Sequence, residues 1–390
     1  MKSKFFLLSL VALALAFTAC NKNQDEPQQS ETDATISVAV KSADLRAYEN
    51  GAGDADMKVQ KLAVMVYQGE AQVAFKEVTD GSLEVKDIET TSGAKTLVVV
   101  ANYADKSLQG LSLDKVKALT HTLSADDQDP TKGTFMLTAE PVSVTLQKGK
   151  NYYGYAAGEG NLISEDKPIE LKHIHAGMAL TNLTVKFAKS YATLYGVKFD
   201  KGELIGLVAK AQSNVFGESL VNDDANYFYG VKLFGTKANK YTPANYTEMA
   251  ELKMDLTEVA PTMTGKGFYV LENNDAKHPT ILCLKATLTQ ADGTPLTAEQ
   301  AAQAVEAGWI VSTTDHSTYY PVLVNWEKDG YTFEGTTDKN GIVRNNKYEI
   351  SLTITGPGTN SPEDPTAEKA NLDVKCKVLP WVIVKQNVVW

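Results

Sequence analysis

Apolar and polar residues alternate along many short stretches of this chain. In "ATISVAVK", Ile36, Val38 and Val40 fall on one side of an extended chain, which is the pattern of a β-strand with one buried face. Turns rich in Gly, Pro, Asn and Asp separate the stretches, so we predict an all-β chain of antiparallel sandwiches rather than βαβ units. The further predicted strands are residues 59–68, 95–103, 141–147, 151–157, 169–187, 204–210, 267–273, 279–288, 319–326 and 347–356.

Two short helices are also predicted. "TAEQAAQAVEAG" has Thr297 as a helix N-cap, Gln300 three residues later and Gly308 at its end, which together form a capping box and a stop signal. Residues 111–119 form a second, shorter candidate, and neither helix carries a chemical motif. A charged break followed by Pro168 predicts a domain boundary near residue 170.

The chain finishes in a strongly strand-forming run, residues 371–390. Apolar residues alternate with polar ones up to Cys376 and Val378, and Pro380 then interrupts the pattern as at a bend or a sheet edge. Burying about five of the apolar side chains would contribute roughly 10 kcal/mol, whereas an exposed strand of this kind is an aggregation hazard. We therefore expect the run to be covered, by its own domain or by another molecule. After Pro380 the run contains Val382, Ile383, Val384, Val388, Val389 and Trp390.

The N-terminus has the layout of an export signal. Lys2 and Lys4 precede a short apolar stretch, residues 5–17, that is too short to cross a bilayer. The following "FTACNKN" resembles the bacterial lipoprotein pattern, although Phe17 replaces the usual leucine. This resemblance implies a signal peptide over residues 1–19 and acylation of Cys20, with an ordinary signal peptide as the alternative. The polar segment after Cys20 is typical of a solvated tether.

Charge and motif content argue against nucleic-acid binding and give no support to catalysis. The 390 residues have a net charge of −10, so no basic surface is predicted to neutralise phosphates. The sequence contains no GxSxG elbow, Walker loop or HExxH motif, and we predict neither an enzyme nor a cofactor.

Three further features are candidate sites. His173 and His175 lie two residues apart and would share a face on one strand, but no third metal ligand is apparent near them, so no metal is predicted. Residues 126–130, "DDQDP", lack the Gly and Glu of a calcium loop and are predicted to be a solvated turn. Cys283 and Cys376 fall in strand patterns and are predicted to be small buried residues, while a disulfide between them stays open.

Arginine is rare and unevenly placed. The 38 Lys and Arg residues include just two arginines, Arg46 and Arg344. Arg46 lies in a Ser-, Asp- and Gly-rich loop after the first strand. An arginine-specific protease would therefore find one loop target near the N-terminus. Cleavage there would free the first strand, and its departure would leave unpaired backbone groups and an apolar trough. The terminal strand of another chain could fill that trough by β-strand addition.

Many ordered stretches resemble the FimA/Mfa-like fimbrillin family of Bacteroidales. They include the lipoprotein leader, "ATISV", "KLAVMVY", "TLVVVAN", "GLVAKAQSNVFG", "GFYVLEN" and the ending "WVIVKQNVVW". The resemblance implies two transthyretin-like antiparallel β-sandwich (Greek-key) domains, here residues 47–170 and 171–390, behind a propeptide of residues 20–46. It also implies cleavage of the Arg46–Ala47 bond by an arginine-specific cysteine protease. The C-terminal run of one subunit would then enter the emptied groove of the next, before or after Pro380.

The same resemblance implies a set of partners and a location. The partners are copies of the chain itself, minor fimbrial subunits, the maturation protease, host or bacterial surface ligands, and the outer membrane through the lipid before cleavage. The product would be a cell-surface fimbrium used for adhesion and colonisation. The main alternative is a monomeric surface lipoprotein that binds glycan or protein ligands. In that case the terminal strand would complete its own core and Arg46 would be incidental. A tip or anchor subunit of the same family is a closer rival to the shaft subunit, because such subunits share its leader and folds.

Overall fold

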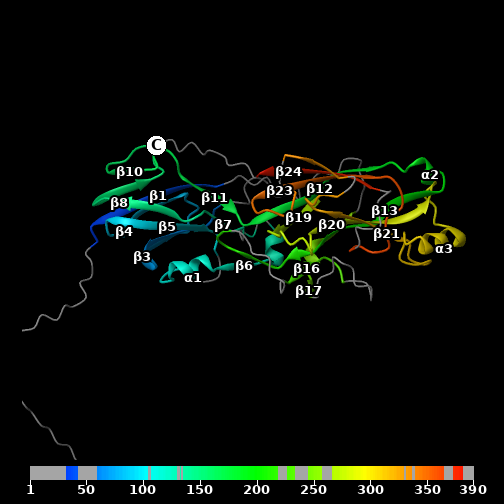
Figure 1. Ribbon diagram of the computed structural model, residues 1–390, viewed down its shortest axis with the longest axis horizontal. Coiled ribbons are helices and arrows are strands. Elements are labelled where there is room, and N and C mark those ends of the chain that lie inside the picture. The colour runs from blue at the N-terminus through cyan, green and yellow to red at the C-terminus, as the bar shows by residue number, and fades with distance from the viewer. Residues whose placement is uncertain are drawn as a thin grey trace, which may run out of the picture.

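The computed structural model describes residues 32–42, 59–103, 107–129, 132, 135–217, 226–232, 245–256, 266–328, 331–335, 339–363 and 372–380. These residues form an elongated body in which the N-terminal strands occupy one end and the C-terminal strands occupy the other (Figure 1).

The N-terminal end of the body is a ten-stranded sheet with the strand order β10-β9-β1-β11-β7-β5-β2-β3, in which β4 also pairs with β1 and β8 with β5. Because the strands change partners along their length, this sheet folds around an interior of its own. The strands are β1 (Ala34–Ser42), β2 (Leu62–Gln68), β3 (Ala71–Val78), β4 (Glu84–Thr90), β5 (Gly93–Ala101), β7 (Leu137–Thr138), β8 (Val142–Leu146), β9 (Gly149–Tyr153), β10 (Asn161–Ile163) and β11 (Ile169–His173).

The C-terminal end contains a five-stranded sheet, β19-β12-β23-β24-β22, and a four-stranded sheet, β18-β13-β20-β21. Its main strands are β12 (His175–Val185), β13 (Tyr195–Leu207), β18 (Lys253–Leu256), β19 (Lys266–Leu271), β20 (Ile281–Gln290), β21 (Ser317–Leu323), β22 (Tyr331–Glu334), β23 (Asn346–Ile354) and β24 (Leu372–Pro380). A small sheet contains β14 (Ala209–Lys210), β16 (Tyr227–Tyr229) and β17 (Tyr246–Glu248), and β6 (Thr120–Thr122) pairs with β15 (Gln212–Asn214).

Two large apolar clusters stabilise these sheets. One fills the ten-stranded sheet and contains fully buried Ile36, Val64 and Leu97. The other begins beside the N-terminal sheet with Met65 and continues between the two C-terminal sheets, where its members include Leu284, Ile350 and Val374. Because the second cluster is continuous, the two ends of the body share apolar packing.

The predicted helices are present and short. α3 (Ala298–Glu306) begins at Thr297, whose hydroxyl accepts a hydrogen bond from the Gln300 backbone N–H at 3.2 Å. Gly308 follows with a φ of 74°, a left-handed conformation that favours glycine. The second prediction corresponds to α1 (Leu113–Lys117). A four-residue helix, α2 (Lys189–Ala192), and the 3₁₀ helices η1 (Ala125–Gln128) and η3 (Ala250–Leu252) complete the helical elements of the described chain.

The capping box gives a testable stability prediction. Thr297→Ala removes the oxygen that accepts from the Gln300 N–H, so we expect the free energy of unfolding to fall by about 1 kcal/mol. Urea unfolding followed by circular dichroism measures this change, and Thr313→Ala in an exposed loop serves as the control. Equal midpoints for Thr297→Ala and the parent protein would contradict the assigned cap.

The all-β prediction is confirmed, and three details differ from the sequence-based expectation. The predicted strand over residues 169–187 is wrong as a single element, because the chain bends at Ile174 between β11 and β12. Strand β3, which pairs with β2, was missed because it has no strongly buried face. Several strand pairs, such as β1 with β9 and β12 with β23, are parallel rather than antiparallel, a feature of long-range pairing that local alternation does not specify.

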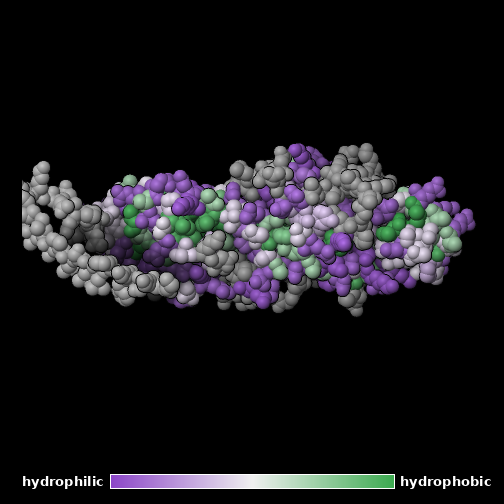
Figure 2. Space-filling model, turned by 90° about the horizontal axis from the view of Figure 1, so that it is seen from below, coloured by the Kyte–Doolittle hydropathy of each residue, from purple (hydrophilic) through white to green (hydrophobic). Residues whose placement is uncertain are grey.

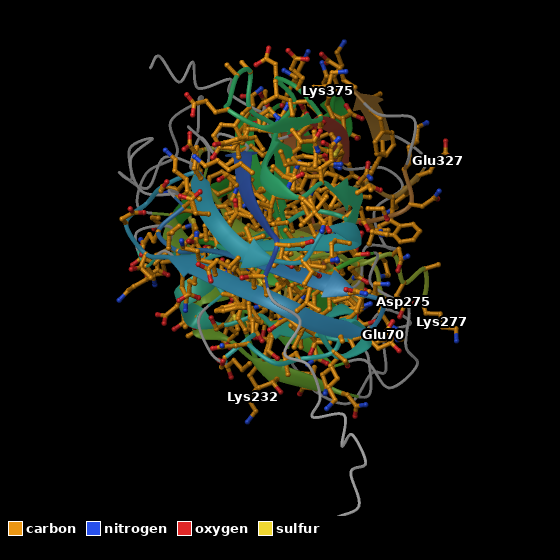
Figure 3. All side chains as sticks on the ribbon, turned by 90° about the vertical axis from the view of Figure 1, so that its left-hand side faces the viewer. Glu70, Lys232, Asp275, Lys277, Glu327 and Lys375 are labelled. Atoms are coloured by element: carbon orange, nitrogen blue, oxygen red, sulfur yellow. The ribbon has the colours of Figure 1, made fainter. Side chains whose placement is uncertain are left out.

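Hydrophilic residues cover much of the visible surface of the described chain (Figure 2). The face in Figure 2 is mostly hydrophilic with small separate hydrophobic patches. Charged side chains such as Lys232, Glu327 and Lys375 project outward in the end-on view (Figure 3). Within the described residues, no helix combines the length and the apolar character needed to cross a membrane.

Candidate functional site

The first strand is paired along both of its edges. Residues 34–39 of β1 run antiparallel to β4, and residues 34–38 run parallel to β9. Residues 40–42 then pair with β11, also in parallel. We call the space that β1 fills, bounded by β4, β9 and β11, the β1 slot. Removing β1 would expose unpaired backbone groups on all three bounding strands.

The side chains of β1 fill the core of the N-terminal sheet. Ile36 and Val38 have no exposed surface, and Val40 is 5% exposed. All three belong to the cluster inside the ten-stranded sheet. Burying one Val or Ile side chain contributes roughly 1.5–3 kcal/mol, so these three together contribute roughly 5–9 kcal/mol. The first strand is therefore a major structural part of the chain.

Polar contacts fix the register of β1 in its slot. At its start, the Asp33 carboxylate accepts hydrogen bonds from the Ser92 backbone N–H at 2.6 Å and from the Ser92 hydroxyl at 3.0 Å. These contacts hold the pKa of Asp33 below its usual value. The pairing with β4 shifts register between Ile36 and Val38, and there the Ser37 hydroxyl accepts from the Asp87 backbone N–H at 3.0 Å. Any strand that took the place of β1 would have to satisfy the same groups.

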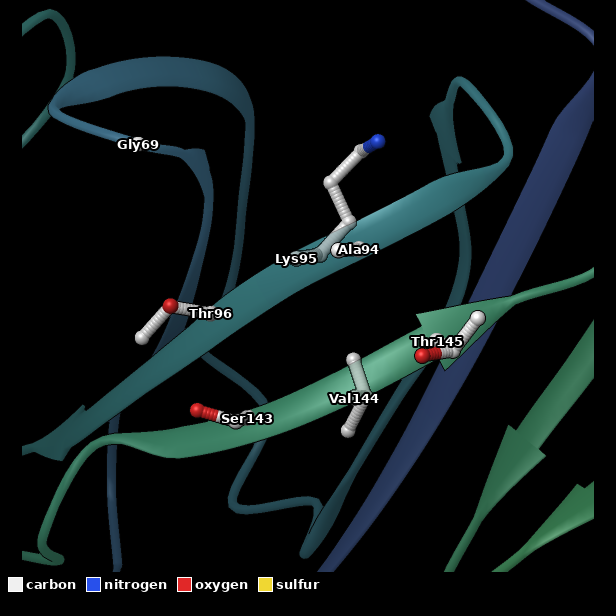
Figure 4. A pocket seen from close by; sticks show the side chains of 7 residues that line it. All are labelled: Gly69, Ala94, Lys95, Thr96, Ser143, Val144 and Thr145. Atoms are coloured by element: carbon white, nitrogen blue, oxygen red, sulfur yellow. The ribbon is translucent and has the colours of Figure 1, made fainter.

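Two open depressions lie on the N-terminal sheet. One, of about 420 Å³, surrounds the start of β1 and includes Asp33 and Gly149. The other, of about 330 Å³, lies over β5 and β8 (Figure 4). There Lys95 extends away from Ser143, and its ammonium donates to the Ser92 carbonyl at 2.9 Å. Because this lysine is committed to a backbone carbonyl, the depression does not place an activated base beside the Ser143 hydroxyl.

The terminal run divides at Pro380. Its first part is β24, which pairs antiparallel with β23 along its whole length and parallel with β22. Val374 and Cys376 are buried, and burial raises the pKa of the Cys376 thiol to about 12. The first part of the run therefore completes the sheet of its own chain.

Several predicted site residues lie outside the described residues. These include Cys20, Arg46 and Ala47, which flank the first strand in the sequence, and the last part of the terminal run: Val382, Ile383, Val384, Val388, Val389 and Trp390.

The second arginine is held in a polar network. The Arg344 guanidinium lies 3.1 Å from a carboxylate oxygen of Glu272 and donates to the backbone carbonyls of Val215 and Asn214 at 3.2 and 2.9 Å. Its side chain is only 15% exposed. A protease would need to disrupt these contacts to cut at this arginine.

The two histidines do not lie on one strand as predicted, although both rings are buried against the Phe135 ring. His173 ends β11 and His175 begins β12, on opposite sides of the bend at Ile174. Potential ligands do lie beside His175, because Nε2 of His121 and Nε2 of His175 are 3.0 and 3.3 Å from the Asp127 carboxylate. Asp127 is fully buried, so the prediction of a solvated turn over residues 126–130 is also wrong at this residue.

The charges in this cluster follow from burial and hydrogen bonding. Burial lowers the pKa of His175, which favours the neutral ring. Burial would raise the pKa of Asp127, but its contacts with His121 and His175 outweigh that effect and lower it. The sequence signal for Asp127 was the "SADD" pattern, because Ser124 and Asp127 cap η1 reciprocally.

The two cysteines of the strand patterns are buried and free, which confirms their predicted burial. Cys283 packs with the third apolar cluster, beside Ile205 and Tyr319, whereas Cys376 belongs to the large C-terminal core. The disulfide left open by the sequence is therefore not formed.

Comparisons with known proteins cover almost the whole chain. Residues 34–173 match the model of the major fimbrial subunit protein (FimA), and residues 175–381 match that of the FimA4 pilin C-terminal domain. Major fimbrium subunits FimA type-3 and type-4 of Porphyromonas gingivalis are 47% and 44% identical to the chain, each over the full length of both proteins.

Solved structures show the same likeness in three dimensions. A fimbrilin (fimA) from Porphyromonas gingivalis W83 is 41% identical and superposes with a TM-score of 0.81, covering 91% of this chain and 99% of its own. A putative cell adhesion protein from Parabacteroides distasonis is 25% identical with a TM-score of 0.64, over 89% and 99% of the two chains. The chain thus belongs to the FimA family of major fimbrial subunits, structural proteins of the cell-surface fimbrium.

Proposed function

We propose that this protein is a fimbrial shaft subunit that polymerises by donor-strand exchange. Cleavage after Arg46 separates β1 from the rest of the chain, and β1 leaves its slot. The C-terminal residues of a neighbouring subunit, Val382–Trp390, then enter the slot. Repetition of this step builds the filament.

The position of β1 in the fold is the main observation that supports this proposal. This strand is paired on both edges and buried on its apolar face, yet it precedes a single arginine-containing linker, residues 43–58. A strand that is both structurally essential and removable by one cut is suited to exchange. An emptied slot has unpaired backbone groups and apolar surface, and only another strand satisfies both.

The pairing of β24 supports the choice of donor segment. Residues 372–380 already pair with two strands of their own sheet, so donating them would expose the C-terminal core. Residues 382–390 retain six apolar side chains of strand-forming types. The donor is therefore assigned to the part after Pro380.

The remaining steps follow from the resemblance of the sequence to its family. Cys20 is the lipid attachment site that holds the precursor at the outer membrane, and an arginine-specific protease cuts Arg46–Ala47. Minor fimbrial subunits and surface ligands of host or bacterial cells are the partners of the finished fimbrium in adhesion. We also propose two domains, residues 47–170 and 171–390, a division supported by the change of sheet between β11 and β12.

A matched pair of precursors tests the maturation step. Parent protein and Arg46→Lys are each incubated with an arginine-specific protease and separated on an unboiled denaturing gel. We expect the parent to form a ladder and Arg46→Lys to remain a monomer, because lysine keeps the charge but is not a substrate. N-terminal sequencing of the ladder is expected to begin at Ala47.

Two outcomes would contradict the proposal. A cleaved parent that stays monomeric at high concentration would instead favour a monomeric surface lipoprotein that binds glycan or protein ligands. A ladder from uncleaved Arg46→Lys would show that β1 need not leave.

A further inference from the structure

A buried cluster of metal-ligating side chains lies where the two ends of the body meet. His121 is in β6, Asp127 is in η1 and His175 is the first residue of β12. One potential ligand atom from each side chain lies within 4.8 Å of the other two. His175 and Asp127 are fully buried, whereas His121 is 16% exposed. The three side chains therefore converge on one point, and His121 is the most exposed of them.

Part of this cluster lacks the hydrogen bonds that burial normally requires. Among the described residues, neither ring nitrogen of His175 has a hydrogen-bond partner, and neither does Asp127 Oδ1. The closest pair, His175 Nε2 and Asp127 Oδ1, is 3.3 Å apart without hydrogen-bond geometry. Leaving a buried polar atom unsatisfied costs roughly 1–3 kcal/mol, and such atoms in a native protein point to a bound water or ion.

The other carboxylate oxygen is already committed. Asp127 Oδ2 accepts hydrogen bonds from the Ser124 backbone N–H at 2.7 Å and from the Ser124 hydroxyl at 3.0 Å, and it lies 3.0 Å from His121 Nε2. This arrangement fixes the carboxylate and directs Oδ1 toward His175. The Phe135 ring packs against the His175 ring with centroids 4.9 Å apart, which restricts the imidazole as well.

We propose that His121, Asp127 and His175 bind one divalent transition-metal ion of the zinc class. Two imidazoles and one carboxylate are ligands that Zn²⁺ accepts in proteins, whereas Ca²⁺ and Mg²⁺ prefer sites made of oxygen atoms. Bonds of about 2.0–2.2 Å in a tetrahedral site place ligand atoms roughly 3.3–3.6 Å apart. The 3.3 Å between His175 Nε2 and Asp127 Oδ1 already matches this spacing. One ligand atom from each of the three side chains lies within 4.8 Å of the other two, so small side-chain shifts would admit the ion.

The ion would join segments that are distant in the sequence. Residues 120–128 extend from the N-terminal part toward the C-terminal sheets, where the Gln128 side chain exchanges two hydrogen bonds with the Tyr269 backbone in β19. A metal bound by His121 and Asp127 on this segment and by His175 on β12 would reinforce the same junction. This role concerns the rigidity of one subunit and is independent of strand exchange.

Cobalt binding by the full, untagged precursor tests the site. After treatment with a chelator, the protein is titrated with CoCl₂ and its visible spectrum is recorded, because Co²⁺ absorbs there when bound in a tetrahedral site. We expect saturation at one equivalent. In a parallel measurement, ZnCl₂ in excess over its dissociation constant should raise the melting temperature, since a ligand that binds only the folded state stabilises it.

Variants identify the ligands. His121→Ala is the first choice, because His121 is the most exposed of the three residues, and it should lose at least about tenfold in Co²⁺ affinity. His316→Ala is the control, since His316 lies in a loop and contacts the Thr313 carbonyl. Absence of stoichiometric Co²⁺ binding by the parent would overturn the proposal. So would unchanged binding by a folded His121→Ala protein, which would place the ion elsewhere.

Discussion

Ile36→Ala is expected to destabilise the precursor by about 2–5 kcal/mol, as large-to-small changes of buried isoleucine do, and to leave the assembled fimbrium unaffected. The Ile36 side chain is fully buried in the N-terminal core. It belongs to β1, the strand that the proposed exchange removes. Urea unfolding measures the effect on the precursor, and the temperature at which an unboiled ladder dissociates in detergent measures the effect on the polymer.

Ile88→Ala is the matched control for this experiment. Ile88 is directly opposite Ile36 in the pairing of β1 with β4, and it belongs to the same apolar cluster. The chemical change is identical, but β4 stays in the mature subunit. This substitution should therefore weaken both the precursor and the polymer. If Ile36→Ala also lowered the dissociation temperature of the polymer, β1 would still be in its slot after assembly.

A pair of C-terminal truncations should separate folding from assembly. A chain ending at Pro380 retains β24 and should fold with nearly the stability of the parent, yet form no ladder after cleavage, because it lacks the donor segment. A chain ending at residue 371 lacks β24 as well. It loses the buried side chains of Val374 and Cys376, so we expect the free energy of unfolding to fall by roughly 3–6 kcal/mol. It also leaves β23 and β22 without their common partner.

Circular dichroism with urea unfolding measures stability for both truncations, and the unboiled gel measures assembly. Efficient polymerisation of the chain that ends at Pro380 would transfer the donor role to residues 372–380. A soluble, equally stable chain ending at residue 371 would show that β24 is dispensable for folding, contrary to its two-sided pairing.

Local patterns in the sequence predicted the elements whose burial is one-sided. The alternation of Ile36, Val38 and Val40 identified β1, and the capping box at Thr297 identified α3 with its correct start. Both features depend on residues within a few positions of one another. β3 lacks such a local pattern, because its partly buried residues are spread over both faces, and it was therefore missed.

Long-range contacts could not be predicted in this way. The parallel pairing of β1 with β9 joins residues more than a hundred positions apart, and no local pattern specifies it. The prediction of a solvated Asp127 is wrong because its burial beside His175 depends on β12, a distant part of the sequence. The bend at Ile174 was missed because no Gly or Pro stands at that position. The sequence did hold a signal, since the apolar residues change from odd positions (Ile169, Leu171) to even positions (Ile174, Met178) there.

The chain connection between β1 and β2 has a consequence for the timing of assembly. While residues 43–58 are intact, β1 competes for its slot at an effective concentration on the order of millimolar, as short linkers allow. A donor strand from a neighbour at about 1 μM is then outcompeted roughly a thousandfold even with equal contacts, which corresponds to about 4 kcal/mol. Once the tether is cut, a departed β1 stays with Cys20 at the membrane and is no longer linked to its slot, so that advantage is lost. In the proposed pathway the commitment to a filament is therefore irreversible.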